Sequence, residues 1–343
     1  MSSLDFIIGS KADLPEKYLE QFFLMLQDNS RARFPVAPYD LDFYRNFWQM
    51  PLQPEDDELQ LWAFENDVLV GFGFVSWKIK YENLHIASAQ IYVLPAKRLK
   101  GFGTSILRLL FQALPPHIET LSIGALLHSI GDSFLKKYQE KFSFVEIINA
   151  VDLSVFDLKE VQAFASSERE RLKQLGYSFV EIGSYDYLAK FDVQNYVRMI
   201  EEIWNDMPVE DLSYDKVVIT VERYKSLIDR FVQLGNKIIG FVAVESKTNK
   251  PIGLTKASIN KSQPYLAEQD DTGVVHAHRG NGLGLALKYQ LLEKLLADPS
   301  ITQWFAGNAL SNDHMLRINK LLKHKEIGRK VVYEFHRKDW HRI

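Results

Sequence analysis

The sequence predicts an α/β (α+β) fold in two tandem domains, each a mixed central sheet flanked by helices. Two observations support this prediction. An Arg-x-x-Gly-x-Gly motif occurs at 98–103 and again at 279–284, so the two copies lie 181 residues apart in a chain of 343. Segments rich in β-forming residues precede each copy and an apolar helical pattern follows it, so strands alternate with helices in both halves.

Length and composition limit the class of protein. A chain of 343 residues is long enough for about two domains with cores of their own. The net charge of −3 gives no basic surface for nucleic acid. We see no apolar run near the roughly 20 residues that span a bilayer, and no signal peptide, so we expect a cytoplasmic protein without a membrane partner. The absence of cysteine excludes disulfides, a cysteine-ligated zinc ion and a cysteine nucleophile.

The first half begins with a helical pattern over 14–26, in which Leu19, Phe22, Phe23 and Leu26 share a face. A loop rich in proline, aspartate and aromatic residues follows at 31–58. We then expect strands at 59–65, 68–77 and 84–94, a helix after Gly103, a strand at 119–127 and a short helix at 133–141.

A charged helical pattern at 157–174 ends at Gly176, a typical helix stop. It is interpreted as the connection, which gives an N-terminal domain at 1–156, a connecting helix at 157–175 and a C-terminal domain at 176–343. In the second half we expect strands at 177–182, 237–245, 251–259, 266–275, 301–307 and 329–336 and helices at 192–205, 220–234, 284–297 and 312–323.

Subtracting 181 from the second half tests whether the chain is a duplication. Leu287, Leu291 and Leu295 then fall on apolar residues of the first half, which are Ile106, Leu110 and Leu114. The apolar segment 302–308 falls on 121–127 in the same way. A chance match of six residues is not expected to keep its register over two further elements, so we interpret the halves as copies.

A strand, a glycine-rich turn and a helix start are suited to binding a pyrophosphate. The unpaired amide groups of a helix N-terminus and the helix dipole favour an anion, and glycines let it approach the backbone closely. Arg98 and Arg279 could add a charge-assisted contact. Neither copy has the Gly-Lys-Ser/Thr of a Walker A loop. Neither completes the dinucleotide fingerprint, because Ile106 and Leu287 occupy its last position.

The remaining pattern, (Gln/Arg)-x-x-Gly-x-(Gly/Ala) after a strand, resembles that of the GNAT acetyltransferase superfamily. The segment 304–319 is also similar to the family's fifth strand and following helix, and the tandem arrangement is similar to that of mycothiol synthase. The resemblance implies acetyl-CoA as co-substrate. It implies cofactor-binding residues Val93, Arg98, Lys100, Gly101, Phe102, Gly103 and Thr104 in the first half, and Val274, Val275, Arg279, Gly280, Asn281, Gly282, Leu283, Gly284, Asn308 and Asn312 in the second.

The resemblance implies different catalytic groups in the two halves. In the family the oxyanion donor is a strand amide, which corresponds to that of Val274 in the second half and Val93 in the first. The family's base is often a carboxylate about eleven residues before the motif arginine. That position holds Glu268, with Asp270 on the same strand face and Asp271 as a further candidate, whereas the first half has Ala87. Its tyrosine acid often follows the helix-starting asparagine by seven residues. Counting from Asn312 gives Asn319, and subtracting 181 gives Tyr138.

We therefore expect an acetyl-CoA-dependent N-acetyltransferase that acts on a small amine, with its chemistry mainly in the C-terminal half. Residues 31–35 and 204–208, after the first helix of each half, are candidates to shape the acceptor site. A CoA-binding sensor or scaffold without catalysis, and an enzyme that acetylates protein N-termini or lysines, are the alternatives. His276 and His278 have a spacing found in metal sites, but no third ligand is evident, so we expect no metal.

Overall fold

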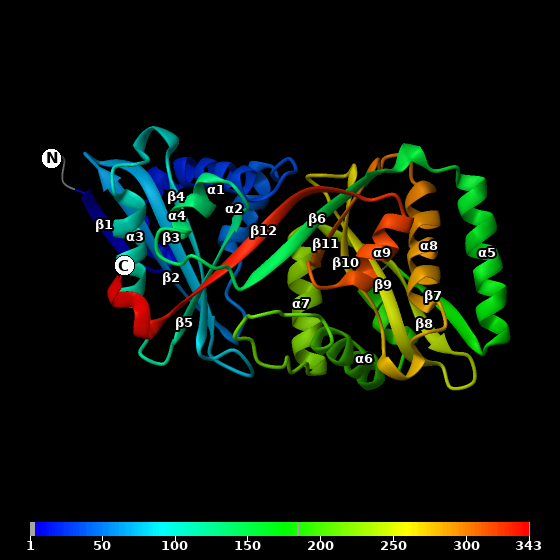
Figure 1. The fold of residues 1–343 in the computed structure, drawn as a ribbon. Coiled ribbons are helices and arrows are strands. Elements are labelled where there is room, and N and C mark those ends of the chain that lie inside the picture. Colours follow the sequence, from blue (N-terminus) through cyan, green and yellow to red (C-terminus); the bar gives the residue numbers. More distant parts are fainter. Residues whose placement is uncertain (1–3, 184, 343) are drawn as a thin grey trace. The chain divides into compact units, whose positions relative to one another are not determined.

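The computed structural model describes residues 4–183 and 185–342, and the chain divides into two compact units (Figure 1). Unit 1 comprises Met1–Glu146, Val209–Lys216 and Gly328–Ile343, and unit 2 comprises Ile147–Pro208 and Val217–Ile327. Each unit therefore combines segments that lie far apart in the sequence. These units are defined by packing, and the boundaries expected at 156 and 175 stay a prediction.

The sheet of unit 1 is mixed. Its first four strands are antiparallel neighbours, β4 and β5 are parallel, and the last strand of the chain, β12, pairs antiparallel with β5. In spatial order the strands are β1 (Leu4–Gly9), β2 (Asp56–Glu65), β3 (Val68–Lys78), β4 (Ile86–Val93), β5 (Thr120–Leu126) and β12 (Lys325–His336).

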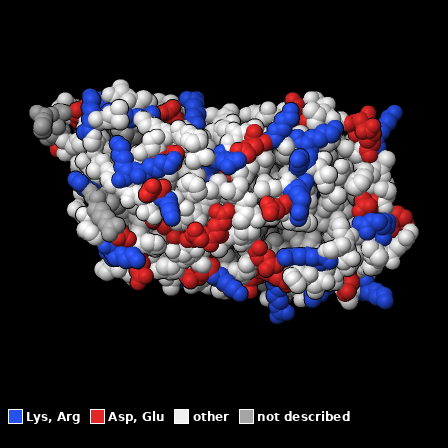
Figure 2. Space-filling view, viewed as in Figure 1, with Lys and Arg blue, Asp and Glu red and all other residues white. Residues whose placement is uncertain are grey.

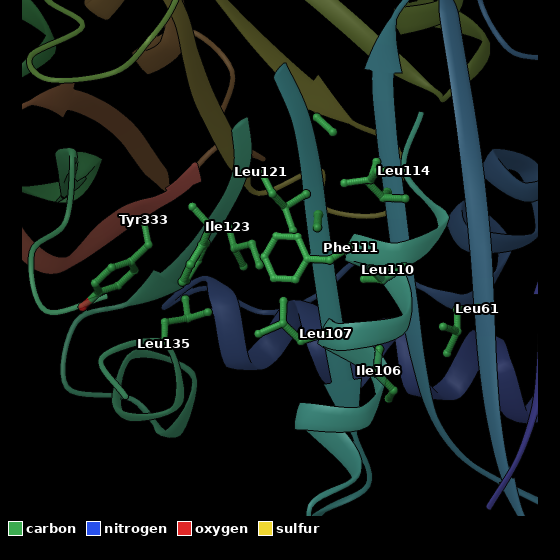
Figure 3. Packing of buried hydrophobic residues seen from close by; sticks show 14 of the residues in the cluster. Leu61, Ile106, Leu107, Leu110, Phe111, Leu114, Leu121, Ile123, Leu135 and Tyr333 are labelled. Carbon is green, nitrogen blue, oxygen red and sulfur yellow. The ribbon is translucent and has the colours of Figure 1, made fainter. Parts of the chain in front are cut away.

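Helices cover both faces of this sheet. On one face α3 (Phe102–Ala113) and α4 (Ile130–Leu135) form a core with the strands, in which Phe111 of α3 points toward Leu121 of β5 (Figure 3). On the other face α1 (Leu19–Arg33) and α2 (Leu41–Gln49) form a second, aromatic core with the strands. Nearly complete burial of these apolar side chains stabilises both layers.

Helix α2 lies inside the segment 31–58 that the sequence analysis predicted to be a loop, so that prediction was wrong. The Asp40 side chain accepts a hydrogen bond from the amide of Phe43 at 2.9 Å and begins the helix. Tyr44 and Trp48 then bury aromatic surface against the sheet. Strands β1 and β6 (Phe144–Asp152) were also not predicted.

Unit 2 repeats this pattern. Strands β7 (Tyr177–Ile182), β8 (Asn236–Glu245), β9 (Lys250–Asn260) and β10 (Leu266–Val274) are antiparallel neighbours, and β10 is parallel to β11 (Gln303–Ala309). β6 is the other neighbour of β11. Strand β6 precedes the connecting helix in the sequence, yet from Ile147 it belongs to unit 2, whereas β12 from Gly328 belongs to unit 1. The two halves have thus exchanged their last strands.

The helices of unit 2 also form two layers. Helices α5 (Leu158–Gln174), α8 (Leu283–Leu296) and α9 (Asp313–Leu321) pack on one face of the sheet, and α6 (Val193–Asn205) and α7 (Val221–Gln233) pack on the other. The predicted class, a mixed sheet flanked by helices in each of two copies, is confirmed.

On the face seen in Figure 2, lysine and arginine side chains are interspersed with aspartate and glutamate. Within residues 4–183 and 185–342, no helix is long and apolar enough to cross a membrane.

Candidate functional site

In each unit, two parallel strands pair at one end and then separate. Strand β4 pairs with β5 only as far as Ala89↔Ile123, and β10 pairs with β11 only as far as Gln269↔Ala306. The last residues of β4 and β10 therefore have no parallel neighbour. We call each such place a splay, and the glycine-rich loop that follows it a phosphate loop.

The two phosphate loops have the same backbone conformation. Leu99 and Gly280 have positive φ angles of 61° and 83°, and Gly101 and Gly282 have 87° and 80°. The first hydrogen bond of each helix runs to Gly101 O or Gly282 O, at 3.0 and 3.1 Å. The amide groups of the first helical turn consequently have no acceptor within the helix, which is the arrangement that binds phosphate groups in proteins.

The motif arginines hold the ends of the strands. Arg98 Nε donates to Val93 O at 3.0 Å, and Arg279 Nε donates to Val274 O at 2.8 Å. Arg279 also forms an ion pair with Asp206. These bonds fix the angle between strand and loop, and a direct phosphate contact by either arginine stays a prediction.

Hydrogen-bond alternation places the amides of Val93 and Val274 at the splays. The next residues, Leu94 and Val275, donate to the neighbouring antiparallel strand at 2.9 Å in both units. In an antiparallel pair the residues on either side of a bonded residue point their amide groups the other way. Val93 N–H and Val274 N–H therefore point away from that neighbour and toward the splay.

Helix α5 adds a cation to the phosphate loop of unit 2 that the sequence analysis missed. Arg171 Nη2 donates to Asn281 O at 2.9 Å, and it lies 2.8 Å from where a Cβ on Gly282 would stand. A Cβ on Gly101 would meet no described atom within 4 Å in unit 1. The basic last turn of the predicted connecting helix was the available signal.

A β-bulge distinguishes β10 from β4. Pairing with β9 runs through Gln269↔Ala257 and then Asp271↔Lys256, so Asp270 is an extra residue. The Gln269 side chain stabilises the bulge, because its Nε2 donates to Lys256 O at 2.6 Å and to Asp271 O at 3.0 Å.

Pairing between β3 and β4 is regular from Gly71↔Val93 to Trp77↔Ala87. The extra residue in β10 changes the correspondence between the halves, since Leu266 occupies the place of Ile86. The counterpart of Glu268 is therefore Ser88, and the predicted match to Ala87 was wrong.

The bulge gives Asp270 an unusual environment. Its Oδ1 accepts a hydrogen bond from Ser258 Oγ at 3.0 Å, while Oδ2 is shielded from solvent and has no partner in the described part of the chain. Burial raises the pKa of Asp270 to about 7, with the charges of Asp271 and Glu268 adding to the rise and Lys256 opposing it. Glu268 itself is exposed. A carboxyl group with this pKa can take up a proton near neutral pH.

Charged and aromatic groups surround Asp270 on the face covered by α6 and α7. Lys256 Nζ lies 2.9 Å from Asp271 Oδ2, and Trp204 Nε1 donates to Asp271 Oδ1 at 3.1 Å. Burial lowers the pKa of Lys256, but the charges of Asp271 and Asp270 outweigh it and raise that pKa. Lys256 also lies 5.9 Å from the ring of Tyr224. We call Lys256, Asp270 and Asp271 the carboxylate–lysine cluster.

Unit 1 has different groups at the corresponding place. Gln90 occupies the position of Asp271, and its Oε1 accepts a hydrogen bond from Asn29 at 3.2 Å. Tyr92 occupies the position of Gly273, stacks on Phe72 with the ring centroids 5.6 Å apart, and bonds to Asp28. An aromatic side chain therefore stands in unit 1 where unit 2 has a glycine.

Tyr138 lies beside the first phosphate loop. Its hydroxyl is 2.6 Å from Thr104 Oγ1, in the first turn of α3. It is not the counterpart of Asn319, however. Ser129 and Asn312 cap α4 and α9 in the same way, so counting seven residues from each cap matches Asn319 with Lys136. The match by 181 was wrong because α8 is two residues longer than α3.

The predicted asparagines are hydrogen-bonded within unit 2. Asn312 Oδ1 accepts the amide of Met315 at 3.2 Å and caps α9. Asn308 Oδ1 accepts from Asn319 Nδ2 at 2.6 Å, and Asn319 Oδ1 accepts from Lys288 Nζ at 2.7 Å. Lys288 was not predicted, because nothing in the sequence distinguishes it from other lysines of the helix.

The two histidines of the second phosphate loop have hydrogen-bond partners within unit 2. His278 Nδ1 lies 3.2 Å from Tyr177 Oη, and the His276 amide donates to Glu202 at 2.8 Å. In the part of the chain that the structure describes, no group of three or more histidine, cysteine, aspartate or glutamate side chains could hold a metal ion.

Searches against protein-family models and curated proteins gave no match. Solved structures do match. A tandem GNAT protein from the clavulanic acid biosynthesis pathway has a TM-score of 0.73 and 18% identity, over 98% of this chain and 99% of that one. A GCN5-related N-acetyltransferase from Sphaerobacter thermophilus has a TM-score of 0.61 and 14% identity, over 97% and 96%.

A third match is a glucosamine N-acetyltransferase region of a fungal multi-domain GH3 β-N-acetylglucosaminidase. It has a TM-score of 0.63 and 13% identity over 98% of this chain, and the match spans 38% of that longer protein. Likeness at these identities describes the fold, whereas the similarity to mycothiol synthase stays a prediction. Together with the splays, the phosphate loops and the bulge, the matches show that this chain has the tandem GNAT fold.

Proposed function

We propose that the protein is an acetyl-CoA-dependent N-acetyltransferase whose chemistry takes place in unit 2. The observation that carries this proposal is Asp270, a shielded carboxyl group with a pKa of about 7 in a bulge four residues before the splay-facing amide of Val274. A base and an oxyanion donor on one short strand segment are the two groups that acetyl transfer to an amine requires.

The binding of acetyl-CoA follows from the second phosphate loop. The pyrophosphate binds the free amides of residues 282–285, where Arg171 adds positive charge. The pantetheine arm extends along the splay between β10 and β11, within reach of Val274 N–H and Asn308. This route brings the thioester to the segment that carries Asp270.

The reaction then balances in a few steps. Asp270 accepts a proton from the ammonium group of the acceptor, and the free amine attacks the thioester carbonyl carbon. The resulting oxyanion accepts a hydrogen bond from Val274 N–H. Its collapse breaks the carbon–sulfur bond and releases the thiolate of CoA, and the second proton of the attacking nitrogen passes to that thiolate or to water, which leaves the neutral amide. Asn319, which occupies the place expected for the acid, has no acidic proton, so we assign no protein group to protonate the thiolate.

The acceptor is proposed to be a small cationic amine. Glu268, Asp270 and Asp271 bring three carboxyl groups to one strand, and Lys256 neutralises one of them. A positively charged acceptor is favoured by the remaining negative charge, and the aromatic side chains of Trp204 and Tyr224 suit an organic cation. An amino sugar, as in the matched glucosamine N-acetyltransferase region, is within this class.

The decisive experiment measures CoA thiol release with Asp270→Asn over a panel of small amines. We expect kcat/KM to fall about 100-fold or more, because general base catalysis is lost, while the Kd for acetyl-CoA stays unchanged. Glu268→Gln is the matched control and keeps most of the activity. Full activity of Asp270→Asn would remove it as the base, and failure of the wild type to bind acetyl-CoA would overturn the proposed function.

Unit 1 suggests a second role, binding without catalysis. Its phosphate loop has the same conformation as the second one, but Gln90 and Tyr92 stand where unit 2 has Asp271 and Gly273. We propose that unit 1 binds CoA or acetyl-CoA as a non-catalytic site. The cytoplasmic location expected from the sequence stays a prediction.

A further inference from the structure

Lys288 places a basic amino group inside the core of unit 2. The residue is fully buried on α8, its Nζ donates to Asn319 Oδ1 at 2.7 Å, and it lies 5.1 Å from the ring centre of Trp304. No carboxylate forms an ion pair with it among the described residues. A buried charge is costly unless it is compensated, so its hydrogen bond is a strong constraint on Asn319.

That constraint determines how two side-chain amides are oriented. An ammonium group only donates hydrogen bonds, so Asn319 must present its oxygen to Lys288. Its NH2 group then points to Asn308 and donates to Oδ1 at 2.6 Å. Asn308, having accepted through its oxygen, has its own NH2 group left to donate. In its ammonium form, which burial confines to pH values below about 7, Lys288 thereby makes Asn308 a donor rather than an acceptor.

Asn308 lies where a donor can serve a ligand. The last residue of β11 paired with β10 is Ala306, so Asn308 stands two residues inside the splay and is half-buried. The pantetheine arm of CoA carries two amide carbonyl groups, which accept hydrogen bonds. A donor fixed at this point of the splay selects a carbonyl oxygen over an N–H group.

We propose that Lys288 is a positioning residue that acts through Asn319 to hold Asn308 as a hydrogen-bond donor for a pantetheine carbonyl. The proposal rests on the proposed function, because it takes CoA to be the ligand of this splay. Lys288 itself contacts neither the cofactor nor the reacting atoms. In unit 1 the motif spacing places Leu107, a buried core residue, at the position of Lys288, so this device belongs to unit 2.

The test compares two ligands that share the phosphate loop. Acetyl-CoA uses the phosphate loop and the splay, whereas adenosine 3′,5′-bisphosphate carries no pantetheine arm. At about pH 6, where Lys288 carries its proton, we expect Lys288→Met to bind acetyl-CoA about tenfold more weakly than the wild type by calorimetry, and to bind the bisphosphate unchanged. A Gly101→Val background removes binding by unit 1 from both titrations. Lys288→Gln gives a second variant with the same expected pattern where the methionine variant is poorly soluble.

Two controls separate positioning from general damage. Gln290→Met alters another buried polar residue of α8, which bonds to α5, and should leave both ligands unaffected. Asn308→Ala should weaken acetyl-CoA binding as Lys288→Met does, and the double variant should lose no more than either alone. KM for acetyl-CoA should rise while kcat changes little.

The outcomes distinguish the positioning role of Lys288 from the proposed function on which it rests. Unchanged acetyl-CoA binding in Lys288→Met, additive losses in the double variant, or equal loss of both ligands would overturn the positioning role and leave the proposed function intact. A wild-type protein that binds neither ligand would overturn both.

Discussion

The carboxyl group of Asp270 has three charged neighbours whose effects on its pKa differ in sign. Glu268 and Asp271 raise the pKa and Lys256 lowers it, on top of the larger effect of burial. Of these neighbours, Glu268 is the exposed one, and it has no part in the ion pair between Lys256 and Asp271. Its charge can therefore be removed with the least disturbance of the cluster.

We predict that kcat/KM rises with pH through a pKa near 7, as Asp270 loses its proton, and that Glu268→Gln moves this rise to lower pH. Removal of a negative neighbour makes the carboxylate easier to form, so the pKa of Asp270 falls. The measurement is the pH dependence of kcat/KM for both proteins from about pH 5 to 9. A rise at the same pH in both would show that another group controls it.

Lys288 leads to a prediction about stability. Burial lowers its pKa to about 7 in the folded protein, whereas the unfolded chain keeps the ordinary value of 10.5. Between these values the unfolded chain binds a proton that the folded protein does not. The free energy of unfolding of the wild type should therefore rise with pH relative to Lys288→Met, by roughly 1.4 kcal/mol per pH unit in this interval.

Urea unfolding of both proteins at about pH 7 and about pH 9.5 measures this difference. The comparison isolates Lys288 because the other titrating groups are common to both chains. His324, the neighbouring titratable group, has a pKa lowered to about 3 by burial and by Lys288, so it stays neutral over this range. A difference that does not change with pH would show that Lys288 titrates at its ordinary value.

At the scale of elements, the helices and strands with a regular apolar pattern were predictable from the sequence. The residue-by-residue correspondence between the two halves was not. The offset is 180 residues at the start of β10, 181 after its bulge and 183 after α8. One inserted residue and two extra helical residues leave the hydrophobic pattern intact, so the sequence does not reveal them. Asp270 is the residue added at the bulge of β10.

The same reasoning explains which parts of the site were predictable. Gly101 and Gly282 indicate the phosphate loops in the sequence, because other residues rarely adopt their positive φ angles. Helix α2 was missed because its short pattern lies among proline and aromatic residues. The basic last turn of α5 indicates a cation, but the contact of Arg171 with the phosphate loop depends on packing between segments distant in the sequence, as does the bond from Lys288 to Asn319.

The start of α8 provides a matched pair of glycines. Gly282 has a φ of 80° and faces Arg171, whereas Gly284 is helical and a Cβ there would meet Ile318 at an ordinary 3.7 Å. We predict that Gly282→Ala lowers the free energy of unfolding by about 1–2 kcal/mol, through strain at positive φ. Gly284→Ala should raise it by up to about 1 kcal/mol, through better helix propensity.

Chemical denaturation of the two variants against the wild type checks these signs. Equal destabilisation by both alanines would mean that Gly284 is also held in a conformation that disfavours a side chain. Calorimetry with acetyl-CoA on the same samples separates stability from binding, because a methyl group at either position also narrows the approach to the loop amides.

Considered as a whole molecule, the chain holds two copies of one fold in which the phosphate loops agree and the adjoining strands differ. Both loops retain the positive φ angles, the arginine-to-carbonyl bond and the splay-facing valine amide. The carboxylate–lysine cluster occurs in unit 2, and Gln90 and Tyr92 stand at the corresponding positions of unit 1. Binding and chemistry should therefore be separable between the copies.

We predict that the protein binds two equivalents of acetyl-CoA, of which the one in unit 2 is used. Gly101→Val places a β-branched side chain at a φ of 87° and should deform the first phosphate loop, reducing the stoichiometry to one while kcat is retained. Gly282→Val should also reduce it to one but abolish turnover. Calorimetric stoichiometry and thiol release on the two variants measure both quantities, and loss of turnover in Gly101→Val alone would place the chemistry in unit 1.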